Sequence, residues 1–212
     1  LGGLSKAVGD AVHVMDAMGK DVIIIETVGT GQQEVEIINH AHTVIVVLVP
    51  GMGDDIQVIK AGIMEIADVF VINKADRAGA GKLENEITLM LNMASDFPGG
   101  WRPPVVKVEN VFEPEVFRRG VGELCDKVRE HYRHLIDTDL IGNRLRRKAL
   151  LELNESLTAS ILEPILRELV EEGEMAKMAD TVLKKESDPY TLAEQVASRY
   201  LKRCFRNEEP AS

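Results

Sequence analysis

The sequence is poor in cysteine, and it has no apolar run long enough to cross a bilayer. Its two cysteines, Cys125 and Cys204, lie far apart and form neither a CxxC motif nor a zinc-finger spacing, so they fit reduced thiols better than a disulfide framework. The run TVIVVLV at 43–49 has the length of a strand, whereas a membrane helix needs about 20 apolar residues. The N-terminus lacks the basic segment and apolar core of a secretory signal. We therefore expect a cytoplasmic protein that has no membrane as a partner.

Positive charge is also scarce. The formal net charge is −10, which argues against nucleic acids and anionic membranes as partners because both would be repelled. One basic cluster interrupts this trend, at Arg144, Arg146, Arg147 and Lys148. Acidic residues flank it, so we interpret it as a solvated helix face.

Four short β-branched runs alternate with helical patterns in the first part of the chain. The runs lie at 21–26, 43–49, 69–73 and 105–108. Nearly unbroken apolar strands that alternate with amphipathic helices predict a parallel sheet covered by helices on both faces. The predicted fold class is therefore α/β.

From about residue 138 the strand signals stop and only helical patterns follow. A long amphipathic helix is predicted over 143–173, with a kink at Pro164. Two further helices are predicted, and Asp188 is suited to cap the second of them. The apolar stripe of the long helix has spacings of three and four residues, and its length favours pairing with a second copy of the chain.

Three polar side chains, Asn73, Lys74 and Asp76, come directly after the buried run at 69–72. In a parallel α/β sheet, ligands bind beyond the carboxyl ends of the strands. Guanine presents N1–H and N2–H₂ as adjacent donors, and one carboxylate, here Asp76, can accept from both at once. Asn73 can donate towards the acceptor edge of the base or tie neighbouring loops together, and the Lys74 stem can lie along the ring. The pattern therefore predicts a guanine-binding loop rather than a polar turn.

A second phrase, IIIETVGTGQQE at 23–34, places Glu26 at the end of an apolar run and Gly29 three residues later. In nucleotide hydrolases of this layout, a strand-end carboxylate organises Mg²⁺ or its bound water, and a nearby glycine lets a backbone N–H approach the terminal phosphate. Gln32 or Gln33 could orient the water, and nothing in the sequence decides between them. A Gly-rich loop between a strand and a helix is the simpler alternative.

A third phrase, VPGMGDDIQVIKAG at 49–62, follows the second predicted strand. Asp54 and the acid after it stand at the start of a predicted helix that carries Gln57 and Lys60, where the helix dipole favours negative charge. Capping alone explains the two acids. It does not explain why two glycines occur at the same predicted sheet edge as the other two phrases.

Taken in order, these phrases resemble the methylmalonyl-CoA mutase-associated GTPases, the MeaB/ArgK family of G-protein chaperones. The resemblance is carried by LGGLSKAV, DVIIIETVGTGQQEVEI, VPGMGDDIQVIKAGIMEIADVFVINKADRAGA and WRPPVVK. These stretches cover most of residues 1–108, and DPYTLAEQVASRYL near the C-terminus is similar more loosely. The resemblance implies a P-loop-type GTPase domain at 1–137, incomplete at its N-terminus, and a helical dimerisation extension at 138–212.

The resemblance also implies cofactors, partners and roles for individual residues. It implies GTP or GDP and Mg²⁺ as cofactors, a homodimer, and a cobalamin-dependent acyl-CoA mutase, such as methylmalonyl-CoA mutase, whose cofactor loading the GTPase protects and gates. Asn73, Lys74 and Asp76 would read the guanine. Asn110 stands where the chain departs from the family pattern, and it could still contact the base. The other implied positions are Glu26, Gly29 and Gln32 for catalysis, Glu26 also for the metal, and Thr27, Asp54, Gln57 and Lys60 as switch and relay residues.

The chain departs from the family pattern in two places. The phosphate-binding GxxxxGK[ST] motif is absent from these residues, since GAGK at 79–82 lacks the spacing and the Ser or Thr. That loop supplies most phosphate stabilisation, so we expect these residues alone to bind GTP poorly, and the Gly-rich beginning favours a longer parent. After the fourth predicted strand, Glu109 and Asn110 replace the small pair that usually backs the guanine in the family.

Two other functions stay open. A metal-inserting maturation GTPase would share the sheet and the guanine reader, but His40, His42, His131 and His134 form no clear ligand set, and we interpret them as surface histidines. A non-catalytic interaction module derived from such a GTPase accounts directly for the absent phosphate loop.

Overall fold

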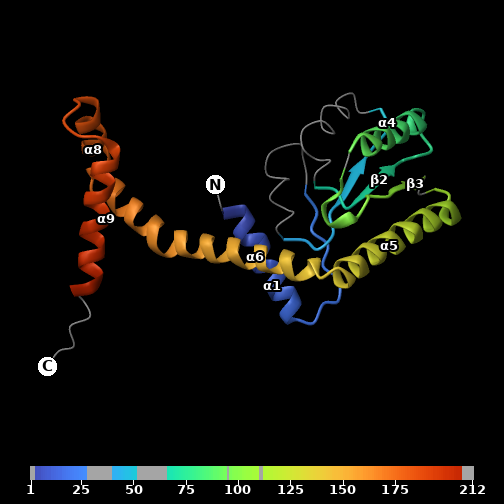
Figure 1. The fold of residues 1–212 in the computed structure, drawn as a ribbon, viewed down its shortest axis with the longest axis horizontal. Coiled ribbons are helices and arrows are strands. Elements are labelled where there is room, and N and C mark those ends of the chain that lie inside the picture. Colours follow the sequence, from blue (N-terminus) through green and yellow to red (C-terminus); the bar gives the residue numbers. More distant parts are fainter. Residues whose placement is uncertain (1–2, 28–39, 52–65, 95, 110–111, 207–212) are drawn as a thin grey trace. The chain divides into compact units, whose positions relative to one another are not determined.

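The computed structural model describes residues 3–27, 40–51, 66–94, 96–109 and 112–206 (Figure 1). Its contacts divide the chain into two units, Leu1–Glu152 and Leu153–Ser212. The helix α6 (Leu140–Leu157) runs across the limit between them. The domain boundary expected between residues 137 and 138 stays a prediction.

A parallel three-stranded sheet forms the centre of unit 1, as the sequence predicts. Its strands are β1 (Ile45–Leu48), β2 (Val69–Asn73) and β3 (Val105–Val108), in the order β1-β2-β3. Both pairings are parallel, with Phe70 opposite Val46 on one side and Val105 on the other. The first four side chains of β2 are at most 3% exposed, which explains its uninterrupted apolar sequence.

Helices cover the two faces of the sheet, and β2 feeds both cores because its side chains alternate. Phe70 and Ile72 point into one core with α4 (Ala80–Met93), which buries Leu83, Ile87 and Leu91. Val69 and Val71 belong to a second core, against which α5 (Pro114–Asp137) packs through the side chains of Phe117, Val121 and Leu124. Helix α5 lies against β3 at Gly120, where a Cβ would lie 2.7 Å from the carbonyl oxygen of Lys107.

The strand predicted at 21–26 is absent from the structure, so this prediction is wrong. Residues 22–27 have no regular secondary structure, and Val22 and Ile24 are 77% and 88% exposed. A β-branched run favours an extended backbone, but it becomes a strand only where a neighbouring strand pairs with it. In the part of the chain that the structure describes, only β1, β2 and β3 pair with one another.

The first helix is α1 (Gly3–Ala17), which lies at the N-terminal end of unit 1. It ends at Gly19 as predicted, with the N–H of Lys20 donating to the carbonyl of Met15 over 3.2 Å. Two hydrogen bonds define a Schellman C-cap, and this is the one that spans more residues.

The C-terminal part consists of helices and the turns between them along its described length. After α6 come a π-helical turn (Thr158–Leu162), α7 (Glu163–Glu171), α8 (Glu174–Leu183) and α9 (Pro189–Arg206). Pro164 has no N–H to donate to the carbonyl four residues back. The irregularity that it predicts takes the form of this π turn, in which the Glu163 N–H donates to the Thr158 carbonyl. Asp188 caps α9 as predicted, accepting from the N–H groups of Tyr190 and Thr191 at 2.9 and 3.0 Å. Among the described helices, none combines the length and apolarity that a bilayer crossing requires.

Candidate functional site

The loop after β2 brings together the three residues predicted to read a base. Asn73 is the last residue of β2 and is half-buried, whereas Lys74 and Asp76 are exposed. Because β2 is the middle strand of a parallel sheet, this loop lies at the carboxyl edge where α/β proteins bind ligands.

The backbone of this loop is held in an unusual conformation by two hydrogen bonds. Lys74 has φ of 55°, a left-handed value that costs a non-glycine residue about 1 kcal/mol. The Asn73 side chain compensates by accepting the Lys74 N–H through Oδ1 at 2.8 Å. The next N–H, of Ala75, donates to the carbonyl of Val108 at the end of β3 over 3.1 Å. The loop is therefore tied to the neighbouring strand by the Ala75 N–H, and both roles predicted for the Asn73 side chain stay predictions.

The turn after β1 lies beside the helix that follows this loop. Gly51 and Gly79 both have positive φ, 88° and 96°, and a Cβ on Gly79 would lie 3.9 Å from the Cβ of Pro50. Gly79 is also the N-cap of α4. Pro50, in the turn after β1, and the N-cap of α4 thus lie close together at one edge of the sheet.

Among the other predicted site residues, the structure describes Glu26 and Thr27. Glu26 and Thr27 are exposed and belong to the segment that forms no strand, so their roles at Mg²⁺ and in the switch stay predictions. The remaining ones lie outside the described residues, and these are Gly29, Gln32, Asp54, Gln57, Lys60 and Asn110.

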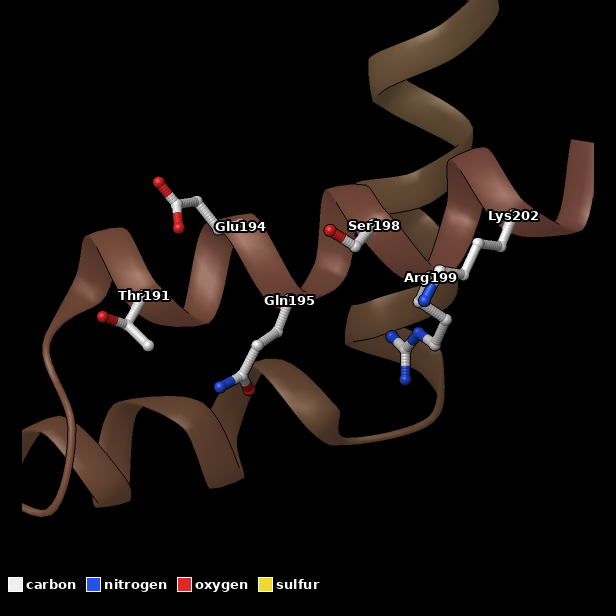
Figure 2. Close-up of a pocket in the computed structure, with 6 residues that line it drawn as sticks. All are labelled: Thr191, Glu194, Gln195, Ser198, Arg199 and Lys202. Carbon is white, nitrogen blue, oxygen red and sulfur yellow. The ribbon is translucent and has the colours of Figure 1, made fainter.

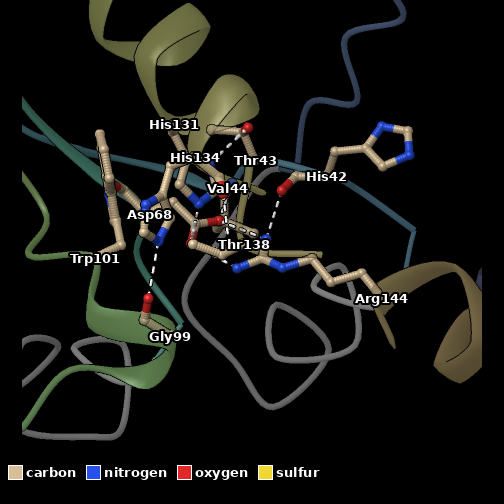
Figure 3. A network of polar contacts seen from close by, with 10 residues as sticks. All are labelled: His42, Thr43, Val44, Asp68, Gly99, Trp101, His131, His134, Thr138 and Arg144. Atoms are coloured by element: carbon tan, nitrogen blue, oxygen red, sulfur yellow. Dashed lines mark hydrogen bonds and ion pairs between the residues drawn. The ribbon is translucent and has the colours of Figure 1, made fainter. Parts of the chain in front are cut away.

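A second polar cluster, which the sequence did not reveal, lies at the opposite end of β2 (Figure 3). Asp68 immediately precedes β2 and is 7% exposed. Its carboxylate accepts two hydrogen bonds from the guanidinium of Arg144 at 2.8 and 2.9 Å and one from the Val44 N–H at 2.8 Å. The His131 ring lies 3.2 Å away through Nε2, and Trp101 Nε1–H donates to the Asp68 carbonyl at 2.8 Å. We call Asp68, Arg144, His131 and Val44 the Asp68 cluster.

The charge state of this cluster follows from its geometry. Burial acts to raise the pKa of Asp68, but the hydrogen bonds from Arg144 and His131 outweigh it and hold the pKa at about 2. An ionised carboxylate only accepts hydrogen bonds, so the His131 Nε2 that faces Asp68 carries a proton. Nδ1 of the same ring is hydrogen-bonded to the Thr43 hydroxyl at 2.9 Å. Every polar atom of this chain of contacts has a partner.

Two predictions are corrected by the Asp68 cluster. His131 is 1% exposed, so it is a core residue and not a surface histidine. Arg144 is bound to a buried carboxylate, so it does not share the solvated face that Arg146 and Arg147 form. One feature of the sequence indicated this cluster, namely an acid placed directly before a buried strand. A buried charge requires a partner, so such an acid predicts a basic or donor group beside it.

The described residues contain no other arrangement suited to a ligand. They hold no group of three His, Cys, Asp or Glu side chains able to bind a metal ion. A hollow of about 530 Å³ runs along α9 in unit 2 (Figure 2) and is lined by Thr191, Glu194, Gln195, Ser198, Arg199 and Lys202. All six come from one helix, and Arg199 already donates to Glu174 at 2.6 and 3.1 Å, so we assign this hollow no site.

Comparison with known proteins identifies the family. A family model described as "Methylmalonyl Co-A mutase-associated GTPase MeaB" matches residues 1–169. The chain belongs to the MeaB family. Its resemblance to that family is therefore confirmed over the sheet, α5, α6 and most of α7.

Individual relatives agree with this assignment. A protein from Pyrococcus abyssi, which its name classes provisionally as a GTPase, is 43% identical over 92% of this chain and 59% of its own length. The "Methylmalonic aciduria type A homolog, mitochondrial" of Mus musculus is 31% identical over 64% of this chain and 32% of its own. Among solved structures, an LAO/AO transport system kinase superposes with a TM-score of 0.68 at 21% identity, over 92% of this chain and 63% of that one. The predicted α/β P-loop-type fold is thereby confirmed.

The chain covers only part of the length of the relatives that it matches. It spans 59% and 62% of the length of the two Pyrococcus proteins that it matches, from P. abyssi and P. horikoshii.

Proposed function

We propose that this chain is the guanine-binding and helical part of a GTPase that protects a cobalamin-dependent acyl-CoA mutase and gates the loading of its cofactor. The observation that carries the proposal is the loop Asn73–Asp76. It is fixed at the carboxyl end of the central strand by the two hydrogen bonds to Asn73 and Val108. MeaB family membership and the name of the family supply the mutase.

Guanine selection follows from the chemistry of the exposed carboxylate. Asp76 can accept from N1–H and N2–H₂ of guanine together, in a bidentate, charge-assisted pair. Adenine has no N1 proton and no N2 amine, so the same carboxylate would face an acceptor. A lost or unmatched hydrogen bond of this kind costs roughly 1–3 kcal/mol, which is enough to select GDP and GTP over the adenine nucleotides.

The phosphate end of the nucleotide requires groups beyond those that the structure describes. We propose that Glu26 binds Mg²⁺ or its water, that Thr27 and Gly29 form a switch with Gln32, and that Asp54, Gln57 and Lys60 relay the nucleotide state to the mutase. A carboxylate is a ligand of the kind that Mg²⁺ prefers, which supports Glu26. The 212 residues contain no GxxxxGK[ST] motif, so we propose that hydrolysis needs a phosphate loop supplied by a longer parent.

The partner surface for a second copy of the chain would lie on the long helix. Leu150, Leu153, Leu157 and Ile161 are 50–59% exposed and follow each other at spacings of three and four residues, which places them along one side of the helix. Burial of such a stripe favours association. We therefore propose a homodimer formed through the C-terminal helices, acting in the cytoplasm.

A nucleotide-binding experiment tests the proposal. The 212-residue chain and a parent that extends upstream through GxxxxGK[ST] are titrated with fluorescent GDP, XDP and ADP. We expect weak binding by the short chain and tight, Mg²⁺-dependent, guanine-selective binding by the parent. Failure of the parent to bind would instead favour the non-catalytic interaction module. Cobalamin transfer to a purified mutase, with and without GTP, then tests the chaperone role, and Lys60→Ala in the parent tests the relay.

A further inference from the structure

Two glycines lie within the long helix α5, and their surroundings differ. Gly122 is exposed, and a Cβ added to it would have nothing within 4 Å. Gly120 is buried, and its Cβ would lie 2.7 Å from the carbonyl oxygen of Lys107 and 3.2 Å from the Cα of Val108. Glycine weakens the interior of a helix relative to alanine, so a buried glycine at a close backbone contact indicates that the packing requires it.

The backbone that Gly120 contacts is the end of β3, and this end supports the base-reading loop. Val108 is the last residue of β3 and lies opposite Asn73 of β2. Its carbonyl accepts the Ala75 N–H over 3.1 Å, and Ala75 directly precedes Asp76. Helix α5 is therefore packed against the residue whose carbonyl holds the loop.

The space at this contact is small, and so is the margin of the hydrogen bond. An ordinary contact of a Cβ begins at 3.4 Å, so a methyl group on Gly120 requires the facing carbonyl to move by about 0.7 Å. Both neighbouring atoms belong to the backbone and have no rotamer that would move them aside. The bond of 3.1 Å between Ala75 and Val108 is already at the long end of the usual range of about 2.7–3.2 Å, so a shift of the strand end would weaken it by lengthening or bending.

Strand β3 is better able to move than α5. In the described part of the chain, β3 pairs with β2 alone, and it has only four residues. Around Gly120, α5 packs into the core of this face through Phe117, Val121 and Leu124. Further along, α5 buries His131 and Leu135. The strain of an added methyl group should therefore fall on the end of β3.

We propose that Gly120 is a positioning residue for the guanine-binding loop. Because it has no side chain, α5 rests directly on the backbone of Lys107 and Val108, and this contact holds the Val108 carbonyl where the Ala75 N–H reaches it. The loop then presents Asp76 to the base. The effect on nucleotides rests on the function proposed above, whereas the effect on Ala75 requires no nucleotide.

The first experiment measures amide hydrogen exchange by NMR on the 212-residue chain without nucleotide. The protection of the Ala75 amide is divided by that of the Phe70 amide. Phe70 N–H donates to the Pro104 carbonyl, just before β3, over 2.9 Å, so it reports the same pair of strands away from Gly120. A change in this ratio isolates the strand end from a general loss of stability.

Three variants are compared through this ratio. Gly120→Ala adds the methyl group at the contact, Gly122→Ala makes the same change at the open position, and Leu135→Ala destabilises the same helix away from the end of β3. We expect the ratio to fall about fivefold in G120A, of the order of one net hydrogen bond, and to stay unaltered in the other two variants.

Each outcome decides on the proposal. An unaltered ratio in G120A would overturn it, because α5 and not β3 would then have yielded. An equal fall in L135A would overturn it as well, since the ratio would then follow stability alone. Should G120A fail to fold, Phe117→Leu decides, because it loosens the same part of α5 and adds no atom at the contact. The ratio should fall in that variant, and an unaltered ratio there would overturn the proposal.

The second experiment measures nucleotide binding by a parent that contains the phosphate loop. The variants are Gly120→Ala, Asp76→Ala and the double replacement, each titrated with fluorescent GDP and ADP. We expect G120A to weaken GDP binding about fivefold, to leave ADP binding unaltered, and to weaken GDP binding no further once Asp76 is replaced. Equal losses for GDP and ADP, or full additivity with D76A, would contradict an action through Asp76. A parent that binds no guanine nucleotide would refute the proposed function, while the exchange ratio would still decide whether Gly120 positions the loop.

Discussion

The substitution Asp76→Asn in a parent that contains the phosphate loop should exchange guanine preference for xanthine preference. Xanthine carries a carbonyl at C2 where guanine carries an amine, so an asparagine amide can donate to it while its own carbonyl accepts from N1–H. The loop needs no rearrangement for this exchange. Its backbone is already fixed by the bonds of Lys74 N–H to Asn73 and of Ala75 N–H to Val108, neither of which involves the Asp76 side chain.

The expected magnitude follows from the exposure of the site. Asp76 is exposed, so water competes for the carboxylate, and the loss of GDP affinity should lie in the lower part of the usual range for a charged hydrogen bond. We expect about 1.4 kcal/mol, a tenfold weaker Kd for GDP, with a gain for XDP of the same order. Fluorescence titration with GDP, XDP and ADP measures all three constants on one sample.

A control and a refuting outcome complete this test. Asp10→Asn makes the same chemical change at an exposed position of α1, and it should leave the three constants unaltered. If D76N binds GDP and XDP in the parent's ratio, the carboxylate does not contact the base and the guanine-binding assignment is wrong.

Three further predictions concern stability and assembly. The pKa of Asp68 is about 2 in the folded chain, below the ordinary aspartate value of 3.8, so its contribution of about 2 kcal/mol is present above pH 4 and is lost as the pH falls towards 2. Urea unfolding of the parent should show this dependence on pH, and D68N should not. Gly120→Ala should destabilise the fold by about 1–3 kcal/mol because its Cβ meets the Lys107 carbonyl oxygen. Gly122→Ala, whose Cβ would have nothing within 4 Å, should stabilise the fold by about 0.5–1 kcal/mol. Thermal melts compare the two variants, and equal effects would refute the close approach. Leu157→Lys should abolish the dimer in sedimentation equilibrium without lowering the melting temperature of unit 1, and an unchanged dimer would exclude the stripe as the interface.

The sequence predicts those parts of the fold that local pattern determines. The strands 69–73 and 105–108 are uninterrupted apolar runs because helices cover both faces of the sheet, and the bounds of β2 and β3 agree with them. Helix ends marked by Gly19 and Asp188 were also predictable, since a cap is a contact between neighbours in sequence. The run at 21–26 has the same local pattern, yet it forms no strand, because pairing depends on a second segment that its own residues do not specify.

The contacts of the Asp68 cluster could not be predicted for a related reason. Asp68 and Arg144 are 76 residues apart, and nothing in either neighbourhood indicates the other. Arg144 stands among three other basic residues, so charge patterning groups it with its exposed neighbours. Only the docking of α6 beside the start of β2 distinguishes it from them.

The two ends of β2 show how hydrogen-bond capacity separates a ligand site from a structural one. At the N-terminal end, Asp68 receives bonds from Arg144, His131 and Val44, so its oxygens are saturated and a ligand would have to displace a buried arginine. At the C-terminal end, Asp76 is exposed, and in the part of the chain that the structure describes its carboxylate has no hydrogen-bond partner. The neighbouring backbone is nonetheless strained and fixed at Lys74. A fixed backbone that presents an exposed carboxylate is pre-organised for a donor from outside the chain, and this contrast supports Asp76 over Asp68 as the residue that binds the base.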